Sequence, residues 1–168
     1  MHLDLPAADY LPHEPPMLLV QRLLEITPDT VACHTAPDAA TFAPFANQDG
    51  SLPAALLLEI MAQTIGVWAG WHCRAAGQPV QPGLILGCRD FSATLATLPA
   101  GACLRSTARK IFYDDGTATF ECAVETDTVR IASATLTTRR VTWDQLENLL
   151  PPSRPGLSPQ AKPVTRLP

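Results

Sequence analysis

The chain has 168 residues, about one domain's worth. With 46% hydrophobic and 17% charged residues it is apolar for a globular protein, but it is not membrane-like throughout. It carries 12 lysines and arginines against 16 aspartates and glutamates, a net charge of −4, without any run of basic residues. A nucleic-acid partner is therefore not expected.

The five cysteines are far apart, odd in number and form no C-x-x-C pair. This usage is typical of a reducing compartment, where cysteine serves as a small core residue. The N-terminus has acids and prolines where a signal peptide needs a basic start and an apolar run. We therefore expect a cytoplasmic protein.

The first third of the chain predicts a loop, then two strands, and then a turn cluster before the next element. Residues 9–16 are punctuated by prolines and lead, through a short helical turn, into an apolar run from Met17 that predicts the first strand. Residues 30–45 combine Thr, Val and Phe with broken alternation, which predicts a strand that frays into a loop. Residues 46–51 form a turn cluster.

The stretch from Gly50 to His72 predicts one long, nearly all-apolar helix. Ser51 is expected to cap it and Pro53 to lie in its first turn, where a missing N–H costs nothing. The helix is expected to end between Arg74 and Gly77.

A membrane span is not expected in this helix, although residues 52–71 approach the required ~20 residues. The stretch contains Glu59 and Gln63, and no cluster of Lys or Arg flanks it.

The second half of the chain predicts antiparallel strands joined by short hairpins, with a redirecting loop at 94–104. A short amphipathic helix begins at Trp143, and residues 151–168 hold six of the 17 prolines and predict a disordered or extended tail. The expected strands are 84–93, 103–113, 117–125 and 129–138.

An apolar helix followed by such strands must be covered on most sides. The fold expected is α+β, with an antiparallel sheet curled around one central helix and a second sheet joined edge to edge in a dimer. Residues 1–145 would form this domain, and 146–168 a short helix and a flexible tail.

Four helix residues, Glu59, Gln63, Gly66 and Gly70, follow i, i+4, i+7, i+11 spacing and form one stripe. Each glycine costs about 1 kcal/mol of helix propensity relative to alanine. Sheet backbone or a slender ligand is therefore expected to approach this face closely.

The carboxyl group of Glu59 admits two interpretations. It either pairs with a buried arginine or with backbone N–H groups and only orients the helix, or it lies in an apolar cleft as an acid, base or nucleophile. Gln63 either orients Glu59 and binds substrate or is a polar residue at the edge of the core.

Three segments resemble the hotdog-fold 3-hydroxyacyl-acyl-carrier-protein dehydratases of fatty-acid synthesis, in order and spacing, over roughly residues 9–140. They are YLPHEPPMLLVQRLLEI (10–26), LPAALLLEIMAQ (52–63) and LILGCRDFSATLATLPAGACLRSTARKI (84–111). Within that superfamily, residues 43–72 are most similar to the dehydratase-like proteins of aryl-polyene gene clusters. Hotdog thioesterases also use an acidic residue on this helix, so the fold alone does not name the reaction.

In those dehydratases a loop histidine removes the α-proton of the acyl thioester, and the helix glutamate protonates the leaving β-hydroxyl. The resemblance assigns the glutamate to Glu59. Fourteen residues earlier, where the family has its histidine, stands Phe45, although Pro53 keeps its place. Phenylalanine cannot accept a proton, which argues against dehydration by this chain alone.

The remaining polar candidates are weaker. His13 matches a family position that is usually structural, and it is the alternative catalytic base. His34 and His72 are expected to be satisfied by local hydrogen bonds, and their spacing does not predict a zinc site. In the altered loop, Asn47 is a substrate-binding candidate and Asp49 is expected to be solvated.

In this superfamily the loop histidine and the helix glutamate of one site generally come from opposite subunits. The resemblance therefore implies a homodimer, or a heterodimer in which a histidine-bearing relative completes the site. It also places Leu86 and Gly87 along the acyl tunnel, where a backbone N–H would meet the thioester carbonyl, and adds Phe45 and Gly66 as substrate contacts.

Three hypotheses follow. The first is a dehydratase-like subunit acting on acyl-carrier-protein thioesters in fatty-acid-type or polyene synthesis, with Glu59, Gln63 and His13 as catalytic candidates. The second is a hotdog thioesterase that uses Glu59. The third is a non-catalytic acyl-binding or scaffolding subunit. None of them requires a cofactor, a metal or a membrane.

Overall fold

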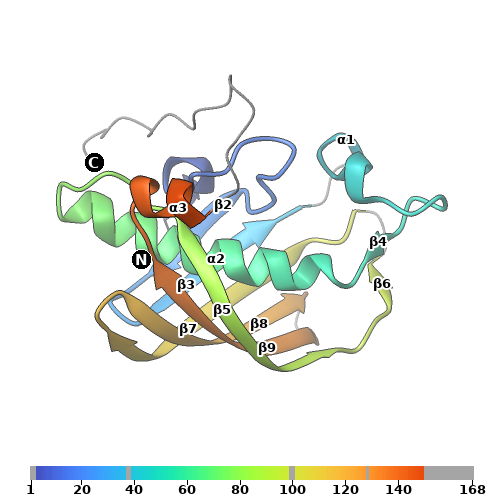
Figure 1. Ribbon diagram of the computed structural model, residues 1–168. Coiled ribbons are helices and arrows are strands. Elements are labelled where there is room, and N and C mark those ends of the chain that lie inside the picture. The colour runs from blue at the N-terminus through green and yellow to red at the C-terminus, as the bar shows by residue number, and fades with distance from the viewer. Residues whose placement is uncertain (1–2, 37–38, 99–100, 128, 150–168) are drawn as a thin grey trace.

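A curved antiparallel sheet wraps around one long helix in the computed structural model, which describes residues 3–36, 39–98, 101–127 and 129–149 (Figure 1). All neighbouring strands of the sheet are antiparallel. Its seven strands lie in the order β1 (Leu5–Pro6), β2 (Arg22–Ile26), β3 (Thr30–Thr35), β7 (Leu104–Asp114), β8 (Thr117–Thr126), β9 (Val129–Arg140) and β5 (Gly83–Ala93).

The core lies between this sheet and helix α2 (Leu56–Ala75). The helix buries Leu57, Ile60 and Met61, and the sheet meets them with fully buried side chains such as Phe120 and Leu136. Each of these side chains contributes about 1.5–3 kcal/mol through burial. The α+β architecture expected from the sequence is confirmed.

The predicted start of the helix is wrong. Helix α2 begins at Leu56, after Ala55, which makes no side-chain cap. Ser51 instead closes a turn, because its hydroxyl donates to Asp49 Oδ1 at 2.6 Å. Pro53 lies in a two-residue strand, β4 (Leu52–Pro53), rather than in the first helical turn.

The predicted end of the helix is confirmed. After Ala75 the chain turns through Gly77, whose φ is +68°. The Gly77 N–H donates to Arg74 O at 2.9 Å, and the Gln78 N–H donates to Cys73 O at 2.8 Å. This is a Schellman motif, which satisfies carbonyls that the helix leaves without intrahelical donors.

Strand β6 (Thr97–Leu98) lies within the segment 94–104, which the sequence predicted as a loop. It pairs with β4, with Leu52 opposite Leu98, and both leucines are buried. The pairing joins residues more than forty positions apart, so local sequence carries no signal for it.

The other short elements are η1 (Ala7–Asp9), α1 (Ala39–Phe42), η2 (Ala43–Phe45) and α3 (Trp143–Leu149). The helix expected from Trp143 is present, whereas the predicted tail at 151–168 lies outside the described residues. Strand β2 begins at Arg22 rather than at Met17. Among the described residues, no helix combines the length and hydropathy of a membrane span.

All five cysteines are free. Cys33, Cys73 and Cys122 are buried, as expected for small core residues, but Cys88 and Cys103 are exposed. Cys88 is exposed because it lies on β5, the last strand of the sheet. Burial raises the pKa of both Cys33 and Cys122 to about 12, so these two thiols stay protonated at neutral pH.

Candidate functional site

A cavity of about 270 Å³ lies beside helix α2. The helix lines it from Glu59 to His72, which spans about 20 Å at 1.5 Å per residue. The opposite walls come from Pro12 and His13 before β2 and from strands β5, β7, β8 and β9. The carboxyl group of Glu59 thus lies at one end of an elongated, largely apolar cavity.

Glu59 is held by two neighbours. Its Oε1 accepts a hydrogen bond from Gln63 Nε2 at 2.9 Å and lies 3.9 Å from His13 Nε2. The side chains of His13 and Glu59 are 34% and 33% exposed, so each is half-buried and open to the cavity. A carboxyl group beside an imidazole in such a cavity can give or take a proton.

Gln63 is 1% exposed and uses its whole amide group. Its Oε1 accepts from the N–H groups of Leu19 at 2.9 Å and Val20 at 3.2 Å. Its Nε2 donates to Met17 O at 2.6 Å as well as to Glu59. These bonds explain why residues 17–20 are not a strand. Gln63 ties them to the helix and orients the carboxyl group.

The two stripe glycines admit the N-terminal segment, residues 3–21, rather than the sheet. A Cβ on Gly70 would lie 1.9 Å from Tyr10 O, and one on Gly66 would lie 2.7 Å from Leu11 Cδ2. The N-terminal segment therefore crosses the helix at close range. Gly66 also lines the cavity. The segment thereby brings His13 to Glu59 across 46 residues of sequence.

The four substrate-binding candidates Phe45, Asn47, Leu86 and Gly87 do not line this cavity. Phe45 packs against the core at the end of η2, and Asn47 is exposed, with Nδ2 donating to Ser51 Oγ at 3.0 Å. Leu86, 56% exposed, is the extra residue of a bulge in β5, and Gly87 follows it in the ladder with β9. Within one chain, therefore, Glu59 and the altered loop belong to different surfaces.

Asp49 lies in that loop and is exposed. The side-chain and backbone donors of Ser51 lower the pKa of this carboxyl group. It therefore remains a solvated carboxylate that closes a turn, as expected.

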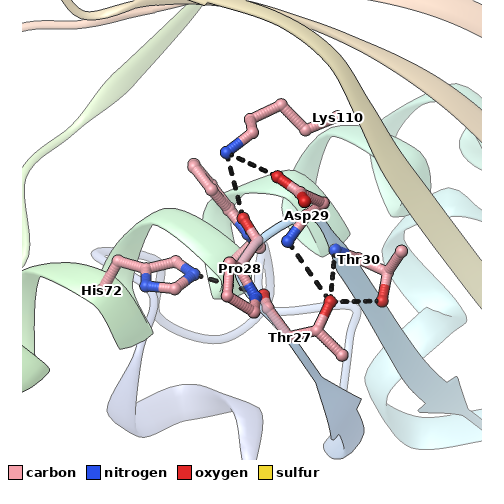
Figure 2. A network of polar contacts seen from close by, with 7 residues as sticks. Thr27, Pro28, Asp29, Thr30, His72 and Lys110 are labelled. Carbon is pink, nitrogen blue, oxygen red and sulfur yellow. Dashed lines mark hydrogen bonds and ion pairs between the residues drawn. The ribbon is translucent and has the colours of Figure 1, made fainter.

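Three residues at the far end of the cavity were not assigned a joint role from the sequence. Trp68, His72 and Lys110 all line the cavity and all contact residues 27–30, where β2 turns into β3. Figure 2 shows His72 and Lys110 at this turn. Trp68 Nε1 and Lys110 Nζ both donate to Pro28 O, at 3.2 and 3.0 Å. Lys110 comes from β7, so no local pattern could have found this group.

The positive charge of Lys110 at this end of the cavity is balanced by the carboxylate of Asp29. Lys110 Nζ lies 2.9 Å from Asp29 Oδ1 and 4.9 Å from the centre of the Trp68 ring. His72 Nε2 lies 3.4 Å from Thr27 O, and burial lowers the pKa of His72. His72 is therefore held by the turn rather than by the local hydrogen bonds expected from the sequence.

His34 lies on β3, half-buried, and is not part of the cavity. Among the residues that the structure describes, no group of three or more His, Cys, Asp or Glu side chains is arranged to hold a metal ion.

Comparisons with known proteins separate fold from family. The chain is 30% identical to one chain of the structure described as the dehydratase heterocomplex ApeI:P from Xenorhabdus doucetiae, with a TM-score of 0.81, over 86% of this chain and 97% of that one. It also matches the TT0310 protein from Thermus thermophilus, at 19% identity and a TM-score of 0.53, over 71% of this chain and 90% of the other. A hypothetical thioesterase protein with coenzyme A from Streptococcus pneumoniae matches at 12% identity and a TM-score of 0.54, over 71% and 84%.

The last two likenesses show the fold alone. No curated protein matches the chain significantly by sequence. The family model of the ApeP dehydratase matches residues 5–150. The resemblance to the hotdog dehydratase-like proteins of aryl-polyene clusters is thereby confirmed, and the chain belongs to the ApeP-like dehydratase family.

Proposed function

We propose that this chain is one subunit of a hotdog dehydratase heterodimer and supplies Glu59 to a site completed by a histidine of a related partner chain. The substrate is a 3-hydroxyacyl thioester of an acyl carrier protein. The partner's histidine removes the α-proton, the α–β double bond forms, and the β-carbon–oxygen bond breaks. The carboxyl group of Glu59 gives its proton to the departing hydroxyl, which leaves as water.

The observation that carries this proposal is the state of Glu59. Its carboxyl group faces a cavity and is oriented by Gln63 and His13. Among the described residues, no lysine or arginine forms an ion pair with it. The carboxyl group is therefore open to the cavity rather than locked in an ion pair with a cation, and it can give or take a proton there.

A partner chain is supported by the end of the sheet. Strand β5 pairs with β9 on one side and is the last strand in the described order, so its other edge offers unpaired N–H and C=O groups. Its large apolar side chains Ile85, Leu86 and Phe91 are 42–56% exposed. A second hotdog sheet, added edge to edge, would cover them. The similar ApeI:P structure is itself described as a heterocomplex.

The same partner would give a role to the residues that do not meet Glu59. Phe45 and Asn47 would face the second, histidine-lacking site of the dimer, and the bulge at Leu86 and Gly87 would lie at the interface. Bulges are frequent next to active sites, where they re-aim the chain. The backbone N–H of Gly87 remains our candidate for the thioester carbonyl.

The test uses a related hotdog dehydratase that has the loop histidine but whose own helix glutamate is changed to glutamine. Mixed with this chain, it should convert a 3-hydroxyacyl thioester to the enoyl form, seen as new ultraviolet absorbance. Either protein alone should be inactive. Glu59→Gln should abolish the activity, and the exposed Glu147→Gln on α3 should not.

Other outcomes would replace the proposal. Release of free thiol that depends on Glu59 would identify a thioesterase. Acyl binding without either reaction would identify a non-catalytic subunit. Dehydration that survives Glu59→Gln would remove this residue from the chemistry.

A further inference from the structure

We propose that Trp68 is the specificity-determining wall of the cavity and sets the length of acyl chain that fits. The inference rests on the proposed function, since it takes the occupant to be an acyl chain. Trp68 lies nine residues after Glu59 on α2, about 14 Å along the helix axis. An acyl chain whose reacting carbons lie at Glu59 and whose tail follows α2 meets the indole at that depth.

The groove leading to Trp68 is made by small side chains. Ala62, Gly66 and Ala69 line the cavity at i, i+4 and i+7, which places them along one face of the helix. Ala62 and Ala69 leave room for a slender apolar chain beside the helix, whereas Leu11 takes up part of the space beside Gly66. Trp68 is the first large side chain of α2 beyond Ile65 to border this space.

Trp68 stands between the cavity and the turn at residues 27–30. Trp68, His72 and Lys110 line the cavity, whereas no residue of the turn does. The same three side chains also contact the turn, and Figure 2 shows His72 and Lys110 approaching it from different directions. Truncation of the indole would therefore extend the cavity toward the turn.

The indole is held firmly enough to act as a wall. Its ring makes edge contacts with Phe120 at 5.3 Å and with His72 at 4.6 Å, between ring centres. The Lys110 ammonium lies 4.9 Å from its ring centre, and its Nε1 donates to Pro28 O. Contacts on several sides fix one orientation, so a longer chain cannot simply displace the ring.

The chain offers a matched control three residues further on. Trp71 is also half-buried on α2 and packs against Tyr10, with ring centres 5.4 Å apart, but it does not line the cavity. Trp71→Leu thus removes a similar amount of packing without opening the space beside Glu59.

The experiment measures the affinity of unreactive amide analogues of acyl-pantetheine, in a series of increasing chain length, by calorimetry. The full chain is used, alone and with its hotdog partner. In the wild type, affinity should rise with length and then stop rising. We call the chain length at which affinity stops rising the limit. In Trp68→Leu this limit should move to longer chains, with about tenfold tighter binding for each two methylenes newly buried. Trp71→Leu should keep the wild-type limit.

The inference is overturned if folded Trp68→Leu keeps the wild-type limit, if Trp71→Leu moves it equally, or if no chain binds the wild type. If Trp68→Leu does not fold, Trp68→Phe keeps an aromatic contact with Phe120 and should move the limit in the same direction by less. A moved limit without any dehydration would contradict the proposed function alone. Dehydration with an unmoved limit would contradict this inference alone.

Discussion

The N-terminal segment and the loop before the helix, residues 43–55, both adjoin α2 but are held in different ways. The N-terminal segment is tied to the helix by the amide of Gln63 and crosses it where Gly66 and Gly70 leave room. The loop is closed mainly by its own short turn, in which Ser51 joins Asn47 and Asp49.

This difference indicates the structural role of the stripe on α2 that is formed by Glu59, Gln63, Gly66 and Gly70. It organises the segment that carries His13, and it leaves the loop that carries Phe45 independent of Glu59. A loop with no bond to the site on its own chain can lose its histidine without disturbing that site. This fits a subunit that keeps the acid and leaves the base to its partner.

The largest expected effect comes from Gln63→Leu. It removes the acceptor for two buried N–H groups, those of Leu19 and Val20, and each unsatisfied group costs about 1–3 kcal/mol. We expect the free energy of unfolding, measured with urea, to fall by about 3 kcal/mol or more. Asn47→Ala in the loop should stay within about 0.5 kcal/mol of wild type. Equal losses would mean that the two segments are held alike.

Gly70→Ala comes next. The added Cβ would collide with the backbone carbonyl of Tyr10, which cannot move without shifting the N-terminal segment. We expect a net loss of about 1–3 kcal/mol in thermal or urea unfolding, despite the gain in helix propensity. Gly66→Ala meets only the tip of the flexible Leu11 side chain and should cost less. The reverse order would contradict this account of the stripe.

His13→Gln tests whether the N-terminal segment serves the chemistry as a positioning element. We expect the composite site to lose between about tenfold and a hundredfold in kcat, with KM and unfolding nearly unchanged. The pH profile of kcat should change shape, because the imidazole beside Glu59 is gone. His34→Gln, outside the cavity, is the control. An unaltered rate and profile would leave His13 a structural residue.

The smallest effect is a pH dependence confined to the loop. Hydrogen bonds from Ser51 lower the pKa of Asp49 below its ordinary 3.8. Their contribution to the order of the loop is therefore present above pH 3.8 and is lost as the pH falls through the lowered pKa. The amide resonance of Ser51 should titrate there, while that of Leu19, bonded to the neutral Gln63, should not. Asp49→Asn should abolish the titration.

Much of the fold could be predicted because its signals are local. The alternation in β5, β7, β8 and β9 and the hairpin turns gave these strands within two residues of their observed ends. The helix exit at Gly77 was equally clear. The helix start was not, since Ser51 and Pro53 suit a cap but are used by a turn and by the β4–β6 pair.

The candidate site divides in the same way. Spacing alone placed Glu59 and Gln63 one helical turn apart, so their hydrogen bond is a property of the sequence. Tertiary structure decided that His13 meets Glu59, that residues 17–20 use the Gln63 amide, and that Lys110 lines the cavity beside Trp68. These contacts join positions that are about forty or more residues apart, and only the packing of the N-terminal segment and the sheet around α2 brings them together.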